Sequence, residues 1–185
     1  LTSLSCGNLL PLDYQVSADG GSCAIDNTGV QCWGEKRDNK TDVPALSNPV
    51  QVSAGLHHTC ALDDTGVKCW GRNKSDQTDV PALSNPVQVS AGGNHTCALD
   101  DTGVQCWGAA KDGAEEWDEG QTTVPALLNP VQVSAGTKHT CALDDTGVQC
   151  WGDNTSGQTT VPDLLFDFDR LFDSDLDGVE DNGDA

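Results

Sequence analysis

Basic and aromatic residues are scarce in this chain of 185 residues, and methionine is absent. Nine Lys and Arg stand against 29 Asp and Glu, which gives a formal net charge of −20. Such a charge repels nucleic acid phosphates and anionic lipid headgroups, and no apolar run reaches the roughly 18 residues of a membrane-spanning helix. Because only 36% of the residues are hydrophobic and 5% aromatic, a single large core of the helical or doubly wound type is also excluded. We therefore expect no nucleic acid partner and no membrane insertion.

Cysteine, by contrast, is frequent, with nine residues in the chain. The chain also does not begin with methionine. The combination predicts a processed protein that folds where disulfides persist. We expect a secreted or cell-surface protein in an extracellular location.

Most of the sequence is one segment that occurs four times. The copy that starts with PVQVSAG at Pro49 recurs from Val87 and from Val131, and a degraded copy surrounds Val16. The first cysteines of successive copies are 37, 37 and 44 residues apart, so the third of these intervals contains an insertion of seven residues. Such repetition is typical of a repeat architecture.

Within each copy, apolar and polar residues alternate with the period of two that is typical of strands, as around Val50 and Val52. The turn sequence Asp63-Asp64-Thr65-Gly66 predicts a tight hairpin in which Gly66 takes a positive φ. Five residues before the proline that closes each copy stands a residue that tolerates the left-handed conformation, namely Asn39, Asp76, Gly120 and Gly157. About four short strands per copy, with turns at regular intervals, indicate the blade of a β-propeller.

The string HTCALDDTGVQCWG, followed by DNTSGQTTVP up to Pro162, resembles the repeat of the regulator of chromosome condensation superfamily. The short copy is similar to that of secreted propellers that inhibit β-lactamases, in which seven blades close a ring. The resemblance covers roughly residues 14–162 and implies an all-β, propeller-like array of about four four-stranded blades near 14–49, 50–86, 87–130 and 131–162. An N-terminal segment, 1–13, and an acidic tail, 163–185, flank the blades. Because the superfamily includes exchange factors as well as inhibitors, the resemblance indicates a fold and not an activity.

Eight cysteines form pairs nine residues apart that flank the hairpin turns symmetrically: Cys23/Cys32, Cys60/Cys69, Cys97/Cys106 and Cys141/Cys150. The hairpin register places Cys60 opposite Cys69 and Leu62 opposite Val67, so we expect one cross-strand disulfide in each blade. The alternatives are a buried pair of free thiols and a zinc site. One histidine per copy is short of zinc ligands and favours a structural hydrogen bond for His58, His95 and His139.

One cysteine and one tryptophan fall outside the periodic pattern. Cys6 is left over, and its alternatives are a partner in a missing segment, an intermolecular bond or a free thiol. Trp117 lies in the acidic insertion, where it either anchors a partner or folds back on the propeller. The periodic tryptophans are expected to pack between neighbouring blades: Trp33, Trp70, Trp107 and Trp151.

The tail after Pro162 has nine acidic residues among its 23. Carboxylates occupy positions 1, 3, 5, 9 and 12 of a loop with Gly178 at position 6: Asp173, Asp175, Asp177, Asp181 and Asp184. With the carbonyl of Val179 at position 7, this spacing predicts one Ca²⁺ site and resembles a thrombospondin type 3 calcium repeat. The alternative is an acidic tail without a fixed ion. The apolar residues before the loop are expected to dock on the last blade or on a neighbour, among them Phe166, Phe168 and Phe172.

No nucleophile with a base, no phosphate-binding glycine loop and no special carboxylate pair stands apart from the repeat, so we expect no enzyme. The sequence predicts a secreted or cell-surface β-propeller module for binding or assembly, stabilised by disulfides and calcium. Its partner is a protein or glycan ligand, or copies of itself; the alternatives are a subunit of an extracellular filament or surface layer and a protein-inhibitor propeller. Four blades with the wedge angle of a seven-bladed ring leave two open edges. We therefore also expect the segments 1–12 and after Pro162 to form contacts in a calcium-dependent polymer.

Overall fold

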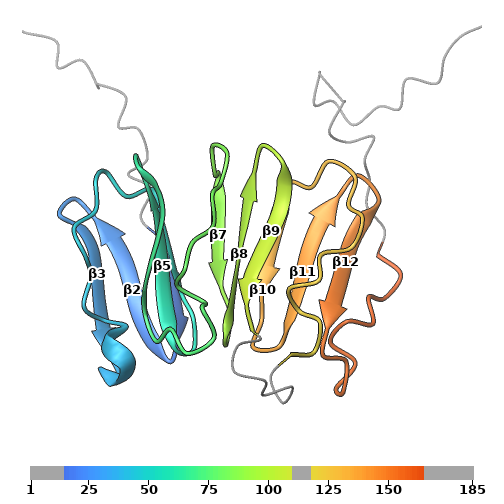
Figure 1. Cartoon of the computed structure of the whole chain (residues 1–185), viewed down its shortest axis with the longest axis horizontal. Coiled ribbons are helices and arrows are strands. Elements are labelled where there is room, and N and C mark those ends of the chain that lie inside the picture. The colour runs from blue at the N-terminus through green and yellow to red at the C-terminus, as the bar shows by residue number, and fades with distance from the viewer. Residues whose placement is uncertain (1–14, 110–117, 165–185) are drawn as a thin grey trace, which may run out of the picture.

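The computed structural model describes residues 15–109 and 118–164, which form twelve strands in four antiparallel sheets of three strands each. Each sheet is one blade (Figure 1). Blades 1 and 2 consist of β1 (Val16–Asp19), β2 (Gly21–Asp26) and β3 (Gly29–Gly34), and of β4 (Gln51–Ala54), β5 (His58–Asp63) and β6 (Gly66–Gly71). Blades 3 and 4 consist of β7 (Gln88–Ala91), β8 (His95–Asp100) and β9 (Gly103–Gly108), and of β10 (Gln132–Ala135), β11 (His139–Asp144) and β12 (Gly147–Gly152). A short 3-10 turn, η1 (Arg37–Asn39), follows β3.

The hairpin that closes each blade forms for local reasons. The carboxylate of Asp63 accepts hydrogen bonds from the backbone N–H of Thr65 at 2.7 Å and from its hydroxyl at 2.6 Å. Gly66 completes the turn with a φ of 110°, a value that favours glycine. The resulting register pairs Cys60 with Cys69 and Leu62 with Val67, as the sequence predicted.

The prediction of a positive φ in the loop before the closing proline is confirmed in all four copies. The φ angles are 57° at Asn39, 54° at Asp76, 80° at Gly120 and 79° at Gly157. These residues lie in the loops that follow the third strands, and these loops reach across to the next blade, as described below.

The prediction of four strands per blade is wrong, since each described sheet has three. The segment after the third strand contains two prolines in the first three copies, for example Pro81 and Pro86, and proline cannot donate to a strand ladder. The segment instead attaches to the next blade through isolated bonds. The N–H of Ser84 donates to the carboxylate of Asp100 at 2.8 Å, and the carbonyl of Ser84 accepts from the N–H of Asp101 at 2.9 Å.

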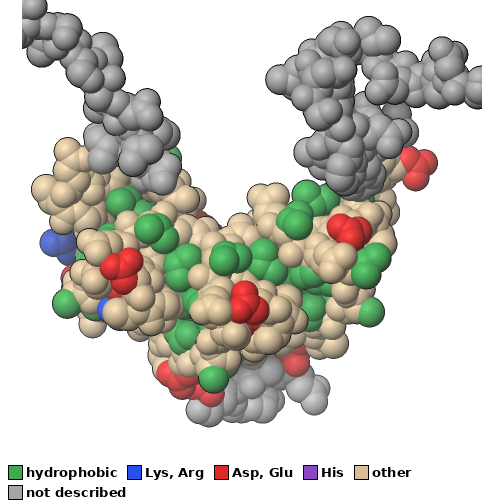
Figure 2. All heavy atoms as spheres, turned by 90° about the horizontal axis from the view of Figure 1, so that it is seen from above, with side chains coloured by type: hydrophobic (Ala, Val, Ile, Leu, Met, Phe, Trp, Pro, Cys, Tyr) green, Lys and Arg blue, Asp and Glu red, His purple; other side chains and the backbone are tan. Residues whose placement is uncertain are grey.

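The hydrophobic core is divided among the junctions between blades. At the junction of blades 2 and 3, Cys60 and Leu62 pack against Val89 and Ala91. The other two junctions have equivalent clusters. Seen from above, the described residues bend into an arc around a hollow (Figure 2). No helix among the described residues is long and apolar enough to cross a membrane.

Candidate interaction site at the blade edges

Side chains of the innermost strand of each blade bind the backbone of the next blade. At the junction of blades 2 and 3, the side-chain oxygen of Gln51 accepts from the N–H of Val89 at 2.8 Å, and the hydroxyl oxygen of Ser53 accepts from the N–H of Ala91 at 2.9 Å. The other two junctions repeat these bonds, from Val52 to Gln15, Ala54 to Ser17, Val133 to Gln88 and Ala135 to Ser90. One Gln and one Ser per blade thus connect neighbouring inner strands.

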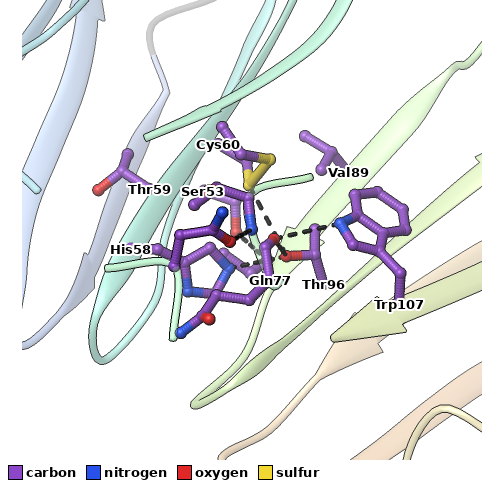
Figure 3. Close-up of a disulfide and its surroundings, with 12 residues drawn as sticks. Ser53, His58, Thr59, Cys60, Gln77, Val89, Thr96 and Trp107 are labelled. Atoms are coloured by element: carbon purple, nitrogen blue, oxygen red, sulfur yellow. Dashed lines mark hydrogen bonds between the residues drawn. A yellow bond between two sulfur atoms is a disulfide. The ribbon is translucent and has the colours of Figure 1, made fainter. Parts of the chain in front are cut away.

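A second layer of contacts links the two blades through the side chains of His58, Thr96 and Trp107 (Figure 3). The Nε2 atom of His58 is 2.8 Å from the hydroxyl of Thr96 on blade 3. That hydroxyl donates to the carbonyl of Gln77 at 2.7 Å, and the same carbonyl accepts from Nε1 of Trp107 at 3.1 Å. Because the proton of Thr96 is directed to Gln77, the Nε2 atom of His58 must be the donor to Thr96.

Burial keeps these histidines neutral. Desolvation lowers the pKa of His58 to about 3 and that of His95 to about 4. His95 repeats the bond at the next junction, where its Nε2 lies 2.9 Å from the hydroxyl of Thr140. The predicted structural role of the histidines is therefore confirmed for His58 and His95.

The indole groups of the periodic tryptophans also belong to the junctions. Trp70 donates to the carbonyl of Lys40 at 2.9 Å, and Trp151 donates to the carbonyl of Gln121 at 2.9 Å. Each acceptor lies in the loop of the preceding blade. The prediction that the periodic tryptophans pack between blades is therefore confirmed for Trp70, Trp107 and Trp151, but not for Trp33, which is 52% exposed.

The first blade presents one half of such a junction without a described neighbour. Val16 occupies the position of Val52, Val89 and Val133, which are 4%, 1% and 2% exposed, but Val16 itself is 76% exposed. Trp33, at the position of Trp70, is 52% exposed. Among the described residues, the N–H groups of Val16 and Ala18 have none of the Gln and Ser acceptors that their equivalents have on blades 2 to 4.

The last blade presents the other half. Gln132 and Ser134 are exposed, and within the described part of the chain their side chains bind no neighbour. Cys141 and Leu143 are partly exposed, whereas Cys60 and Cys97 at the positions of Cys141 are 0% exposed. We name these surfaces the head edge, formed by Val16, Ala18, Ser22 and Trp33, and the tail edge, formed by Gln132, Ser134, His139, Cys141, Leu143 and the carbonyl of Gln158.

The four predicted disulfides are confirmed and join Cys23 to Cys32, Cys60 to Cys69, Cys97 to Cys106 and Cys141 to Cys150. The Cα atoms of each pair are 4.0 to 4.1 Å apart. Each bridge stays within one blade. The bridges of blades 1 to 3 also contribute to the apolar junction with the following blade.

The other predicted site residues lie outside the described residues: Cys6, Trp117, Phe166, Phe168, Phe172 and the calcium loop with Asp173, Asp175, Asp177, Val179, Asp181 and Asp184. Within residues 15–109 and 118–164, no three His, Cys, Asp or Glu side chains gather in a way that could hold a metal ion. The calcium site therefore stays a prediction from the loop spacing.

The Gln, Ser and Thr side chains that link the blades were not predicted from the sequence. Their signal was present, since Gln51, Ser53 and Thr59 recur in register in the full copies. Repetition alone does not distinguish a polar link from a solvent-facing position. The structure makes the distinction because it places the next strand within hydrogen-bond distance.

The repeats of this chain match a known family of repeats. Residues 50–77, 87–114 and 131–158 match the family model of the regulator of chromosome condensation (RCC1) repeat. Three of the four copies thus match this repeat. The three matches begin at the residue directly before β4, β7 and β10, so each matched segment starts one blade.

Solved RCC1-like propellers have the same fold. The entire ectodomain of the receptor kinase CR4 from Physcomitrella patens aligns with a TM-score of 0.61 at 24% identity, over 82% of this chain and 44% of the ectodomain. Prp20p from Saccharomyces cerevisiae aligns with a TM-score of 0.63 at 22% identity, over 80% of this chain and 45% of Prp20p. Human WBSCR16 aligns with a TM-score of 0.62 at 21% identity, over 84% of this chain and 55% of the human protein.

The chain thus spans about half the length of these structures. At these identities the likeness concerns the fold alone. No protein with a curated description is similar enough to this sequence to count as a match.

Proposed function

We propose that this chain is a non-enzymatic β-propeller module that works outside the cell by binding protein through its head and tail edges. The observation that carries the proposal is the exposure of junction residues at both edges. Val16 is 76% exposed at a position where the other three blades bury valine. An apolar residue next to strand donors that have no acceptor among the described residues favours association with another protein.

The disulfides support an extracellular location. Four bridges in a chain of this size are typical of proteins that fold in an oxidising compartment. The similar structure from the receptor kinase CR4 is an ectodomain, which is the part of a receptor that lies outside the cell. The net charge of −20 suits an exposed, soluble surface.

Binding is favoured over catalysis because the repeated polar side chains already have structural partners. The imidazole of His58 donates to Thr96, and the hydroxyl of Ser53 accepts from the backbone of blade 3. The carboxylate of Asp63 accepts hydrogen bonds from Thr65 in its own turn. Among propellers of this fold, Prp20p is described with its binding to Gsp1p and histones, which illustrates a protein-binding use of the fold.

Calcium is a second element of the proposal. The tail after Pro162 has the carboxylate spacing of a calcium loop, and we propose that Asp173, Asp175, Asp177, Asp181 and Asp184, with the carbonyl of Val179, bind one Ca²⁺. The remaining alternatives are a subunit of a filament or surface layer, a glycan-binding module, and an inhibitor propeller like those that act on β-lactamases. The unlike edges favour the assembly alternative most, because contacts between unlike surfaces generate rings or filaments.

The test is a capture experiment with edge variants. The purified chain is immobilised and exposed to the extracellular protein fraction of its source, and retained proteins are identified by mass spectrometry. We expect specific proteins to be retained by the unmodified chain and lost with Val16→Asp. The matched control is Val87→Asp, which adds the same charge at a valine that is 65% exposed but lines the hollow. Equal capture by all three chains would contradict the proposal.

A further inference from the structure

The head edge and the tail edge of this chain are the two halves of one junction. Each of the three described junctions uses the same set of groups on its two sides. The outgoing side supplies a Gln and a Ser acceptor, a loop carbonyl and an apolar surface around a disulfide. Blade 4 has all of these groups on the side that faces away from blade 3. Blade 1 has the corresponding donors and apolar residues on the side that faces away from blade 2.

We propose that the tail edge of one copy docks on the head edge of a second copy, and that two copies close a ring of eight blades. The proposal rests on the proposed function, in which the edges bind protein, and it names the partner as a second copy of this chain. It uses the contacts of the existing blade junctions and adds no new type of contact, and closure of eight blades needs a slightly smaller turn at each junction than closure of seven.

The inner layer of this junction follows from the equivalent positions. Gln132 takes the place of Gln51 and would accept from the N–H of Val16 on the second copy. Ser134 takes the place of Ser53 and would accept from the N–H of Ala18. In the three described junctions these bonds measure 2.8 to 3.1 Å.

The outer layer fits as well. Ser22 stands where the other blades have Thr59, Thr96 and Thr140, so a hydroxyl is present to meet the Nε2 atom of His139. The carbonyl of Gln158 corresponds to that of Gln77, which accepts from Trp107, and it would accept from Trp33. Trp33 is therefore a full counterpart of the tryptophans that already join blades.

The changes in the degraded first copy support this assignment because they lie on its other side. Gly21 replaces the histidine of the other blades, and Lys40 replaces Gln77. Gly21 stands at the position from which His58 reaches the next blade, and the ammonium group of Lys40 binds Glu35 of its own copy at 2.9 Å and the carbonyl of Leu56 in blade 2 at 3.0 Å. The head edge thus keeps the valine, alanine, hydroxyl and tryptophan of a junction.

The apolar part of the junction has a partner in the same way. Val89 is buried against Cys60 and Leu62. Val16 of the second copy would be buried against Cys141 and Leu143, which are partly exposed in the single chain. Propellers with up to eight blades are common, and two arcs joined at both ends leave no open edge among the described blades.

The test measures the mass of the purified full chain by sedimentation, with variants that damage one edge each. Val16→Asp damages the head, and Ser134→Lys removes the acceptor at the tail. We expect two-chain complexes for the unmodified chain, and an association weakened about tenfold or more for each variant alone. Val87→Asp, the charge-matched control in the hollow, keeps the two-chain mass.

A mixture of the two variants distinguishes a head-to-tail contact from a contact between identical surfaces. The intact tail of Val16→Asp can meet the intact head of Ser134→Lys, so the mixture is expected to regain two-chain complexes through one junction. A contact between identical surfaces would not be rescued in this way. Cys6→Ser is included, and the two-chain mass is expected to persist in it.

A chain that stays monomeric at its highest soluble concentration overturns the inference, as do complexes that Cys6→Ser abolishes or a mixture without rescue. Filaments of more than two chains overturn the closed ring. Each of these results leaves the proposed function to be judged separately, since that test captures other proteins on the same edges.

Discussion

The Nε2 atom of His58 lies 2.8 Å from the hydroxyl of Thr96 on the neighbouring blade. The two side chains are 38 positions apart in the sequence, and both are fully buried. Since Thr96 also donates to the carbonyl of Gln77, it binds two elements of blade 2 at once. The packing between blades in this chain thus depends on polar links as well as on apolar contacts.

Removal of this hydroxyl is expected to destabilise the chain. Thr96→Val leaves the Nε2 donor of His58 and the carbonyl of Gln77 each without this partner, a loss worth about 1 to 3 kcal/mol of unfolding free energy. The measurement is chemical denaturation at neutral pH. Thr123→Val is the control, because Thr123 is exposed and its hydroxyl binds no described residue. Equal stability of the two variants would contradict the role of the link.

Acid is expected to weaken the fold from about pH 6.5 downward. The folded pKa is lowered to about 3 for His58 and to about 4 for His95, so the unfolded chain takes up protons at these groups before the folded chain does. Their contribution is complete above the unfolded pKa of about 6.5 and is lost as the pH falls, with a slope approaching about 1.4 kcal/mol per pH unit for each histidine.

The measurement is the free energy of unfolding between pH 7 and pH 4.5. In this range the histidines of the unfolded chain take up protons, whereas most carboxylates remain ionised. Burial raises the pKa of Asp63, but hydrogen bonds from Lys68 and Thr65 together outweigh it and hold that pKa below its ordinary value. Asp63 therefore loses its contribution only below about pH 4. His57, whose pKa burial also lowers, acts in the same direction as His58. A His58→Gln, His95→Gln double variant is expected to show a flatter profile, and an unchanged slope would refute the assignment.

The junctions near the hollow leave no space for a methyl group at Gly92. A Cβ atom there would lie 2.5 Å from the carbonyl oxygen of Gly136 and 2.5 Å from the ring of His95. Gly92→Ala is expected to cost at least the roughly 1 to 3 kcal/mol of an overpacked site. Gly21→Ala is the matched control, because its Cβ would meet no atom closer than 3.5 Å. Thermal unfolding of both variants checks the expectation, and a tolerated Gly92→Ala would show that the blades are further apart.

The disulfides are expected to stabilise each blade separately. A Cys60→Ala, Cys69→Ala double variant removes a short loop closure that contributes on the order of 2 to 3 kcal/mol in the chain-entropy model. It also removes sulfur atoms from the apolar cluster with Val89. Peptide mapping without reduction should show the other three bridges unchanged, and scrambled bridges would indicate that the blades do not fold independently.

Calcium uptake is expected to depend on the tail alone. Asp177→Ala should abolish binding of one Ca²⁺ in a calorimetric titration, since a central carboxylate of the loop is lost. Asp153→Ala, which changes a carboxylate of the described blades, should leave the uptake intact. If the unmodified chain takes up no calcium, the calcium site is refuted.

Much of this fold follows from the sequence because the repeat displays it four times. The spacing of Cys60 and Cys69 around a four-residue turn defines the hairpin register and the disulfide. The fourth strand could not be excluded in the same way, because the alternation of Val80, Leu83 and their neighbours resembles a strand, while Pro81 and Pro86 remove its donors.

The edges were harder to predict than the blades. Val16 and Val52 are the same residue type in the same pattern, and only the presence or absence of a neighbouring blade makes one exposed and the other buried. A sequence pattern reports what a position can bury and not what covers it. The links formed by Gln51 and Ser53 were missed for a related reason, since their partners belong to another copy of the repeat.

Amide hydrogen exchange at Val16 and Ala18 tests the open-edge assignment most directly. In the monomer we expect both amides to exchange much faster than those of Val52 and Ala54, which donate to Gln15 and Ser17. As the chain concentration rises and rings form, the protection of Val16 and Ala18 should approach that of Val52 and Ala54. Exchange at Val16 and Ala18 that is slow in the monomer, or that stays fast when two-chain complexes form, would contradict the assignment.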